Sequence, residues 1–278
     1  VPRRPHVAGR PATAPRSFPD AGIHLLRTPP EDGPESWCRC DGGPHGFLSI
    51  AAHAHADALS VEVRYDGTEV LVDPGTYCYH GEPEWRSYFR STLAHNTIEI
   101  DGQSSSEPGG PFLWTTHADT APVPTPPSDA AVQWWSARQR GYVRLDASLR
   151  HRRTVRLDSR ARELVIEDVV TSRGHHVLRL ALHLGPDVEV EDVEGEPRVL
   201  ELQWPSRQGA AHAELHLPAR LEWSRHRGEQ DPPLGWYSPR FAERVPTTAI
   251  IGSAAIDSSV TLRTRLVFLD GGGSGSRG

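Results

Sequence analysis

Three polar residues that can bind metals or move protons, His53, His55 and Asp57, alternate with alanines in the run AHAHADALS at 52–60. Successive side chains of a strand point to opposite faces, so this spacing predicts that all three project from one face of an extended segment. Apolar residues continue that face further along the chain, which indicates that it points into the fold. Imidazoles and carboxylates are costly to bury without partners. Metal coordination or proton transfer would supply such partners.

The chain that follows is rich in side chains of the same chemistry. They are Asp73, Tyr77, Tyr79, His80, Arg86, Tyr88, Arg90 and His95. Imidazole and carboxylate ligands suit zinc, which accepts them in a tetrahedral set. Tyr, His and Arg are also the groups that elimination from an anionic sugar requires, since Arg neutralises a uronate carboxylate while His or Tyr transfers protons. Tyr77 and Tyr79 are expected to be packing aromatics, and surface ion pairing is an equal alternative for Arg86 and Arg90.

The order of these motifs resembles the heparinase II/III-like family of polysaccharide lyases. The residues that carry the resemblance are HAHADALS from His53, VDPGTY from Val72, WRSYFRSTLAHNT from Trp85 and DGQ from Asp101, with weaker matches at RRTV from Arg152 and GWYSPRF from Gly235. The resemblance is strongest over 45–115 and extends to about residue 268. Because several motifs occur in the same order, the match is specific.

This resemblance implies a lyase that cleaves uronic-acid polysaccharides such as heparin, heparan sulfate or alginate by β-elimination. His53 matches the catalytic histidine of the family. His55, Asp73 and His95 match the ligands of a bound zinc, usually thought structural. A tyrosine before the last of these ligands lines the cleft in some members, and Tyr88 is the best match.

The resemblance also implies partners and a location. An anionic uronate polysaccharide would be the substrate, with Arg86 and Arg90 as its contacts. Family members have an N-terminal helical toroid that supplies further catalytic groups, and these 278 residues resemble only the β-sandwich part. A periplasmic, cell-envelope or secreted location is expected by resemblance. The chain has no visible signal peptide, which leaves the cytoplasm open.

The composition predicts an all-β fold. The chain has 25 Pro and 25 Gly, and helical periodicity is not sustained over about 15 residues anywhere. Short alternating runs with polar turns are typical of a large antiparallel β-sandwich, supersandwich-like by resemblance. The expected strands are Gly22–Arg27, Gly46–Ile50, Ala54–Tyr65, Glu69–Asp73, Asn96–Ile100, Gly141–Leu149, Arg153–Leu157, Glu163–Val170, His176–Leu184, Arg198–Trp204, Ala211–Leu217, Thr247–Gly252 and Ser259–Phe268.

A two-residue hairpin is expected at Tyr65–Thr68, where Asp-Gly forms the turn. Its register places Arg64 opposite Glu69 and Val63 opposite Val70. In this register the aspartate of the VDPGTY motif falls on the face opposite the second histidine of the HAH run. A shared metal therefore requires a bulge or a bend, which the Pro-Gly pair of the motif would provide.

Net charge and hydropathy argue against two classes of protein, nucleic-acid binders and membrane-spanning proteins. The formal net charge is −6, and a mildly acidic chain is a poor nucleic-acid binder because phosphate neutralisation needs clustered positive charge. No apolar run reaches the roughly 18 residues of a membrane span.

The cysteines are Cys38, Cys40 and Cys78. Residues two apart rarely form an unstrained bridge, so reduced, packed thiols are expected.

The sequence divides into a Pro- and Arg-rich extension at 1–20, a β-sandwich domain at 21–270 and a Gly/Ser tail at 271–278. Two other functions stay open. One is a metal-stabilised β-sandwich that binds glycan without cleaving it. The other is a cupin-like metalloenzyme, because His-x-His on a strand occurs there too. The glutamate that a cupin needs is served poorly by Glu62, which falls on the wrong strand face.

Overall fold

The computed structural model describes residues 16–29, 33–46, 50–206 and 209–269. Its largest element is an eight-stranded antiparallel sheet. In spatial order this sheet contains β14 (Glu189–Asp192), β15 (Val199–Ser206), β16 (Gly209–His216), β23 (Val260–Phe268), β12 (Glu163–Thr171), β11 (Arg150–Asp158), β10 (Val132–Gln139) and β9 (Thr120–Pro122).

Two smaller antiparallel sheets form the facing layer. The five-stranded sheet contains β1 (Ser17–Phe18), β2 (Ile23–Arg27), β3 (Ser36–Asp41), β4 (Val61–Tyr65) and β5 (Thr68–Leu71). The four-stranded sheet contains β17 (Glu222–Arg227), β22 (Thr248–Ile256), β13 (His176–His183) and β6 (Ile98–Ile100). A single bridge between Leu71 and Leu184 joins the two sheets. We call this junction the seam.

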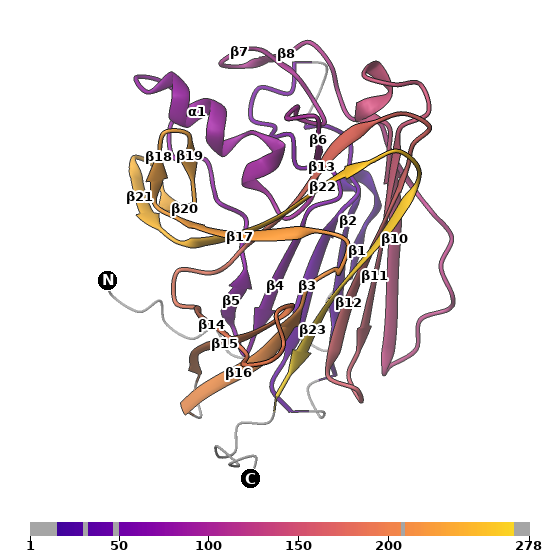
Figure 1. Cartoon of the computed structure of the whole chain (residues 1–278), viewed down its shortest axis with the longest axis vertical. Coiled ribbons are helices and arrows are strands. Elements are labelled where there is room, and N and C mark those ends of the chain that lie inside the picture. Colours follow the sequence, from indigo (N-terminus) through magenta and orange to yellow (C-terminus); the bar gives the residue numbers. More distant parts are fainter. Residues whose placement is uncertain (1–15, 30–32, 47–49, 207–208, 270–278) are drawn as a thin grey trace.

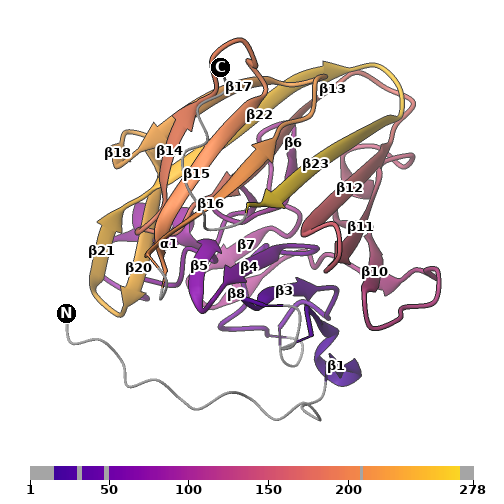
Figure 2. The same cartoon turned by 90° about the horizontal axis from the view of Figure 1, so that it is seen from below.

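The core lies between the layers. The inward side chains of alternate strand positions are buried, as in β4 and β15. One apolar cluster joins the five-stranded and eight-stranded sheets through Leu26, Val61, Val63, Leu157, Leu202 and Leu266. Another joins the four-stranded and eight-stranded sheets through Ile98, Leu178, Leu180, Val170 and Leu262. Figure 2 shows strands β3 and β4 facing the strands β16 and β23 of the large sheet. The predicted all-β sandwich is therefore confirmed.

Short elements gather at one end of the sandwich. Helix α1 (Pro83–Phe89) lies at this end with the β7 (Pro108–Gly110) and β8 (Leu113–Trp114) pair. The pairs β18–β19 (Glu229–Gln230, Pro233–Leu234) and β20–β21 (Trp236–Arg240, Glu243–Pro246) lie beside α1 (Figure 1). Three 3-10 helices complete the described chain, η1 (Pro19–Ala21), η3 (Thr92–Ala94) and η4 (Gly141–Arg144).

The predicted strand Ala54–Tyr65 is wrong in its first half, because β4 begins only at Val61. Backbone groups of the preceding residues are used in turns instead of a ladder. Ala54 N–H donates to the Ala51 carbonyl, and Ser60 N–H donates to the Asp57 carbonyl. The HAH run is therefore a looped segment, and its histidines do not share a strand face.

The predicted hairpin is correct at its turn, but the predicted pairing of Val63 is wrong. Arg64 pairs with Glu69 as expected, but Val63 pairs with Leu71 because a β-bulge takes up Val70. The extra residue shifts the rest of β5 by one position, which reverses the face on which later side chains fall. An irregularity of the kind that a shared metal site would need therefore lies at Val70, earlier in the chain than the Pro-Gly pair to which it was assigned.

Other predictions vary in outcome. Gly141–Leu149 is not a strand: η4 occupies its start, where the Tyr142 hydroxyl turns inward to donate to the Ile98 carbonyl. All three cysteines are buried free thiols, as predicted. The expected strand at Gly46–Ile50, the extension and the Gly/Ser tail lie largely outside the described residues, and the described Gly46 and Ile50 are not in strands. None of the helices in the described part has the length and apolar composition needed to span a bilayer.

Candidate metal centre and active site

The seam between the two smaller sheets positions a group of potential metal ligands. Asp73 follows the end of β5 by two residues, and His95 lies directly after η3, just before β6 begins. His55 comes from the looped HAH segment. One ligand atom from each residue lies within 4.8 Å of the others, and these three are the one such group in the described part of the chain. The structure thus brings together the three ligands that the sequence predicted.

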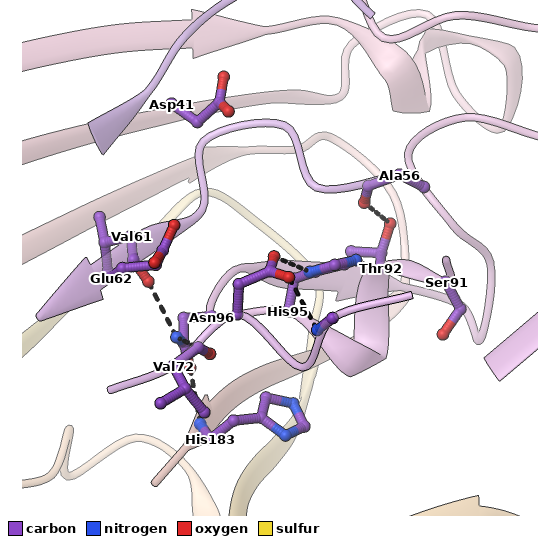
Figure 3. Close-up of polar contacts among 12 residues, drawn as sticks. Asp41, Ala56, Val61, Glu62, Val72, Ser91, Thr92, His95, Asn96 and His183 are labelled. Carbon is purple, nitrogen blue, oxygen red and sulfur yellow. Dashed lines mark hydrogen bonds and ion pairs between the residues drawn. The ribbon is translucent and has the colours of Figure 1, made fainter. Parts of the chain in front are cut away.

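The side-chain amide of Asn96 holds the seam closed. Its nitrogen donates to the Val61 carbonyl at 2.8 Å and to the Val72 carbonyl at 2.9 Å, and its oxygen accepts the His183 N–H at 2.6 Å. Figure 3 shows this amide between the three chain segments, with His95 beside it. Every strong hydrogen-bonding site of the buried amide is used, so the backbone next to His95 has little freedom.

The three ligand side chains fit a zinc ion. Asp73 Oδ2 lies 3.0 Å from His95 Nδ1, while Gly75 N–H donates to Asp73 Oδ1 at 2.9 Å and orients the carboxylate. Two ligands on a tetrahedral zinc are separated by roughly 3.3 Å at ordinary bond lengths. The Nε2 atom of His55 is buried without a hydrogen-bond partner in the structure. Such an orphaned imidazole nitrogen is expected where a metal accepts its lone pair.

The protonation preferences of His55 and Asp73 agree with metal binding. Burial, together with the charge of His95, lowers the pKa of His55 to about 3, so its imidazole is neutral at pH 7. Burial alone would raise the pKa of Asp73, but the charge and hydrogen bond of His95 outweigh it and hold that pKa below its usual range. A neutral imidazole and an ionised carboxylate are the forms that coordinate metals. Burial alone would lower the pKa of His95, but the charge and hydrogen bond of Asp73 raise it, so a metal bound by His95 would have to displace a proton.

The looped HAH segment is fixed by the chain around His95. Ala56 N–H donates to the Arg90 carbonyl at 2.9 Å, and the Ala56 carbonyl accepts the Thr92 hydroxyl at 2.6 Å, as Figure 3 shows for the second bond. Both backbone groups next to His55 are thereby satisfied. This explains how a segment without regular structure buries His55 while leaving His53 exposed.

His53 has a tyrosine partner. Its Nδ1 lies 3.2 Å from the Tyr79 hydroxyl, and the two rings meet edge to face with centroids 5.4 Å apart. An exposed imidazole in contact with a phenol is a pair that can exchange protons with a bound molecule. Tyr79 was expected from the sequence to be a packing aromatic, so its contact with His53 was not predicted.

Tyr88, the tyrosine predicted to line the cleft, is buried in α1. Its hydroxyl accepts the Trp236 N–H at 3.4 Å, and burial raises its pKa to about 12. A phenol that is this hard to ionise and enclosed on the helix serves to join α1 to β20. Tyr79 is the tyrosine that the structure places at His53.

Arg86 and Arg90 are buried, with 2% and 5% of their surface exposed. Both donate to the Pro111 carbonyl, at 3.3 and 3.2 Å, and Arg86 also lies over the Tyr79 ring at 5.0 Å. Neither forms a described ion pair with a carboxylate, and Nε of each is buried without a partner. Burial lowers the pKa of Arg90 to about 10, with a contribution from the charge of Arg86. These are two adjacent cations whose charge the described residues leave uncompensated.

Arg153, in the weakly matching RRTV motif, is a second residue for which the sequence analysis predicted no role. It is fully buried and pairs with both carboxylate oxygens of Asp168, at 2.7 and 3.0 Å. Its remaining nitrogen donates to the carbonyls of Leu59 and Asn96, which follow His55 and His95 in the chain. Arg153 therefore ties the large sheet to the candidate site. The sequence feature that could have identified Arg153 is a charged residue at an inward-facing strand position.

Several solved structures share this fold. A structure described as the heparinase III BT4657 gene product has a TM-score of 0.72 and 20% identity, covering 94% of this chain and 37% of that chain. The heparan sulfate lyase HepC from Pedobacter heparinus has a TM-score of 0.70 and 15% identity, covering 92% and 36%. The chain thus spans little more than a third of the length of these proteins.

Comparison of the sequence with family models gives a direct result. No curated protein matches the chain. The model of the family described as "Heparinase II/III-like, C-terminal" matches residues 10–263, which include every ligand and catalytic candidate discussed above. This match covers most of the chain, and the chain therefore belongs to the heparinase II/III-like, C-terminal family.

Proposed function

We propose that this chain is the β-sandwich part of a polysaccharide lyase that acts on a uronate-containing glycan by β-elimination. The observation that carries the proposal is the contact between exposed His53 and the Tyr79 hydroxyl, next to a group of two buried imidazoles and a half-buried carboxylate. Family membership supports the reaction class. In this class a base removes the C5 proton of the uronate, the C4–C5 double bond forms as the bond from C4 to the bridging oxygen breaks, and that oxygen takes a proton from the protonated base or from water.

In this proposal His53 and Tyr79 act on the substrate. One of these two residues takes the C5 proton or polarises the adjacent carboxylate. The other hydrogen-bonds to the first residue and keeps its side chain oriented. His55, Asp73 and His95 would hold a zinc ion, which when bound neutralises the buried carboxylate and fixes its ligands. Because His55 lies two residues from His53, a rigid His55 restricts where His53 can point.

The two buried arginines would serve the anionic substrate from behind the His53–Tyr79 pair. Arg86 contacts the Tyr79 ring, and the uncompensated charge of Arg86 and Arg90 favours an anion above them. The structure supports this electrostatic role more strongly than direct contact, because both side chains are almost fully enclosed. An N-terminal helical toroid in the same polypeptide, and a periplasmic, cell-envelope or secreted location, remain predictions from the resemblance.

The test uses the longest natural polypeptide that contains these 278 residues. Heparan sulfate, heparin and alginate are each incubated with it, and the unsaturated uronate product is followed by its ultraviolet absorbance. His53→Ala and Tyr79→Phe are each expected to lower the rate by about 10²–10⁴-fold, while His175→Ala at an exposed site is the control. Bound zinc should be unchanged in both variants. Full activity in His53→Ala would contradict the proposal, and wild-type binding without product would favour the non-catalytic glycan-binding alternative.

A further inference from the structure

Three aromatic rings meet beside His53. The Tyr79 ring lies 5.7 Å from that of Phe112 and 5.6 Å from that of Phe241, and the Phe241 side chain is 61% exposed. We call Tyr79, Phe112 and Phe241 the aromatic shelf. Its third ring is the most exposed of the large hydrophobic side chains in the described ranges.

The shelf is rigidly supported even though its rings come from distant parts of the sequence. Phe241 lies at the turn of β20–β21, and the next residue, Ala242, donates its N–H to the Tyr77 carbonyl at 2.7 Å. Phe112 follows Pro111, whose carbonyl accepts from both buried arginines. The exposed Phe241 ring is therefore held on an anchored hairpin, in contact with the Tyr79 ring.

The chemistry around the shelf selects one kind of ligand. A pyranose ring has an apolar face of C–H groups that packs against aromatic rings, and a uronate adds a carboxylate at its edge. On the shelf, the Tyr79 ring lies over the Arg86 guanidinium and beside the His53 ring. An acidic sugar complements both the rings and this positive charge.

We propose that the aromatic shelf stacks against a sugar ring of the polysaccharide next to the uronate that faces His53, with Phe241 as a specificity-determining contact. The inference rests on the proposed function and extends it to a subsite built largely by the GWYSPRF hairpin. It predicts that Phe241 contributes to binding of a uronate polymer and leaves the fold unaffected.

Binding is measured on the 278-residue chain by affinity electrophoresis in gels containing alginate, heparan sulfate or neutral amylose. Phe241→Ala is expected to weaken binding to the uronate polymers by about tenfold, and Phe241→Trp is expected to retain it. The matched control is Phe18→Ala, an exposed phenylalanine on β1 with 41% exposure. Thermal unfolding of all three variants should equal that of the wild type, which separates lost binding from lost folding.

Each contrary outcome overturns the inference in its own way. Equal binding by Phe241→Ala and wild type removes Phe241 from the subsite and leaves the lyase proposal to its own assay. No binding of any uronate polymer by the wild-type chain also refutes the shelf as a binding element of this chain. If Phe241→Ala abolishes self-association without changing glycan binding, the shelf is a protein contact instead.

Discussion

The backbone N–H of Ser238 donates to the carbonyl of Pro74 at 2.7 Å. This contact places the GWYSPRF hairpin directly against the residue that follows Asp73. Gly75, the next residue, has φ +82°, and a Cβ there would lie 2.5 Å from the Ser238 carbonyl oxygen. Two motifs that are far apart in the sequence therefore share one packing contact, and the second motif holds the first in place.

Gly75→Ala is expected to destabilise the chain and displace Asp73. The left-handed backbone costs about 1–2 kcal/mol for a residue with a side chain, and the overlap with Ser238 adds to it because two backbones must separate. Gly67→Ala is the matched control, since its φ is +84° and nothing lies within 4 Å of its added Cβ. Denaturant unfolding of both variants isolates the overlap, and an equal loss in the two would contradict it.

Asn96→Asp is expected to cost about 3 kcal/mol or more of unfolding free energy. The substitution keeps the shape but removes the two N–H groups that satisfy the Val61 and Val72 carbonyls, and buried unsatisfied groups cost about 1–3 kcal/mol each. Exposed Gln103→Glu is a control for the added charge. Urea denaturation at pH 7 measures both variants. A loss below about 1 kcal/mol would show that the amide does not hold the seam.

Removal of metal is expected to lower thermal stability. Elemental analysis of the purified chain should give about one zinc per chain, with the zinc lost in His55→Ala, Asp73→Asn and His95→Ala. A chelator should lower the melting temperature of the wild type and leave these three variants unchanged. His175→Ala, at an exposed histidine, should keep the metal. A metal-free wild type prepared without chelator would remove zinc from the proposal.

Acid is expected to weaken the contact between the large sheet and the site. The Asp168 carboxyl is buried, which alone would raise its pKa, but Arg153 and His151 lower it to about 2. Because the folded pKa lies below the ordinary value of 3.8, the ionised form stabilises the fold by about 2 kcal/mol above pH 4, and this contribution is lost as the pH falls toward 2. His151, whose pKa burial lowers, adds acid sensitivity below pH 6.5.

Asp168→Asn tests this dependence. At pH 7 the variant is expected to lose about 3–5 kcal/mol, because Arg153 keeps a buried charge without its partner. Its stability should then vary less than that of the wild type between pH 4 and pH 2. Asp257→Asn, at an exposed site, is the control. Parallel stability curves for wild type and Asp168→Asn over this interval would contradict the assignment.

Arg244 is expected to stabilise the hairpin that carries Phe241. Its guanidinium lies 3.9 Å from the Trp85 ring centroid and 4.7 Å from that of Tyr77, which joins β21 to α1. Arg244→Ala is expected to cost about 1–2 kcal/mol through lost cation–π contact. Arg240→Ala, on the same hairpin with 73% side-chain exposure, is the control. Equal thermal stability of the two variants would exclude the ring contact as a source of stability.

The fold class and the clustering of the three candidate ligands were predictable because their signals are local. Alternating apolar residues mark strands one at a time, and His55, Asp73 and His95 belong to short motifs with a family resemblance. The strand assigned to the HAH run was wrong because the alternation there reflects a loop that uses its backbone groups in turns and in bonds to Arg90 and Thr92.

Residues whose role depends on distant partners escaped prediction. Tyr79 is defined by Phe112, Phe241 and His53, which come from three separate segments. The burial of Arg86 is visible only once the β7–β8 pair lies above it. A bulge or bend was expected for a shared metal and was assigned to the Pro-Gly pair, because nothing in the local sequence indicates the bulge at Val70.

The Asn96 amide has a consequence for how the facing layer transmits motion. The Asn96 side chain donates two hydrogen bonds to the segments around β4 and β5 and accepts one from β13, beside the backbone bridge between Leu71 and Leu184. The five-stranded and four-stranded sheets are therefore separate in topology but continuous in hydrogen bonding. Because the residue next to His95 is bonded to both sheets, a change in their relative position would also move the candidate site.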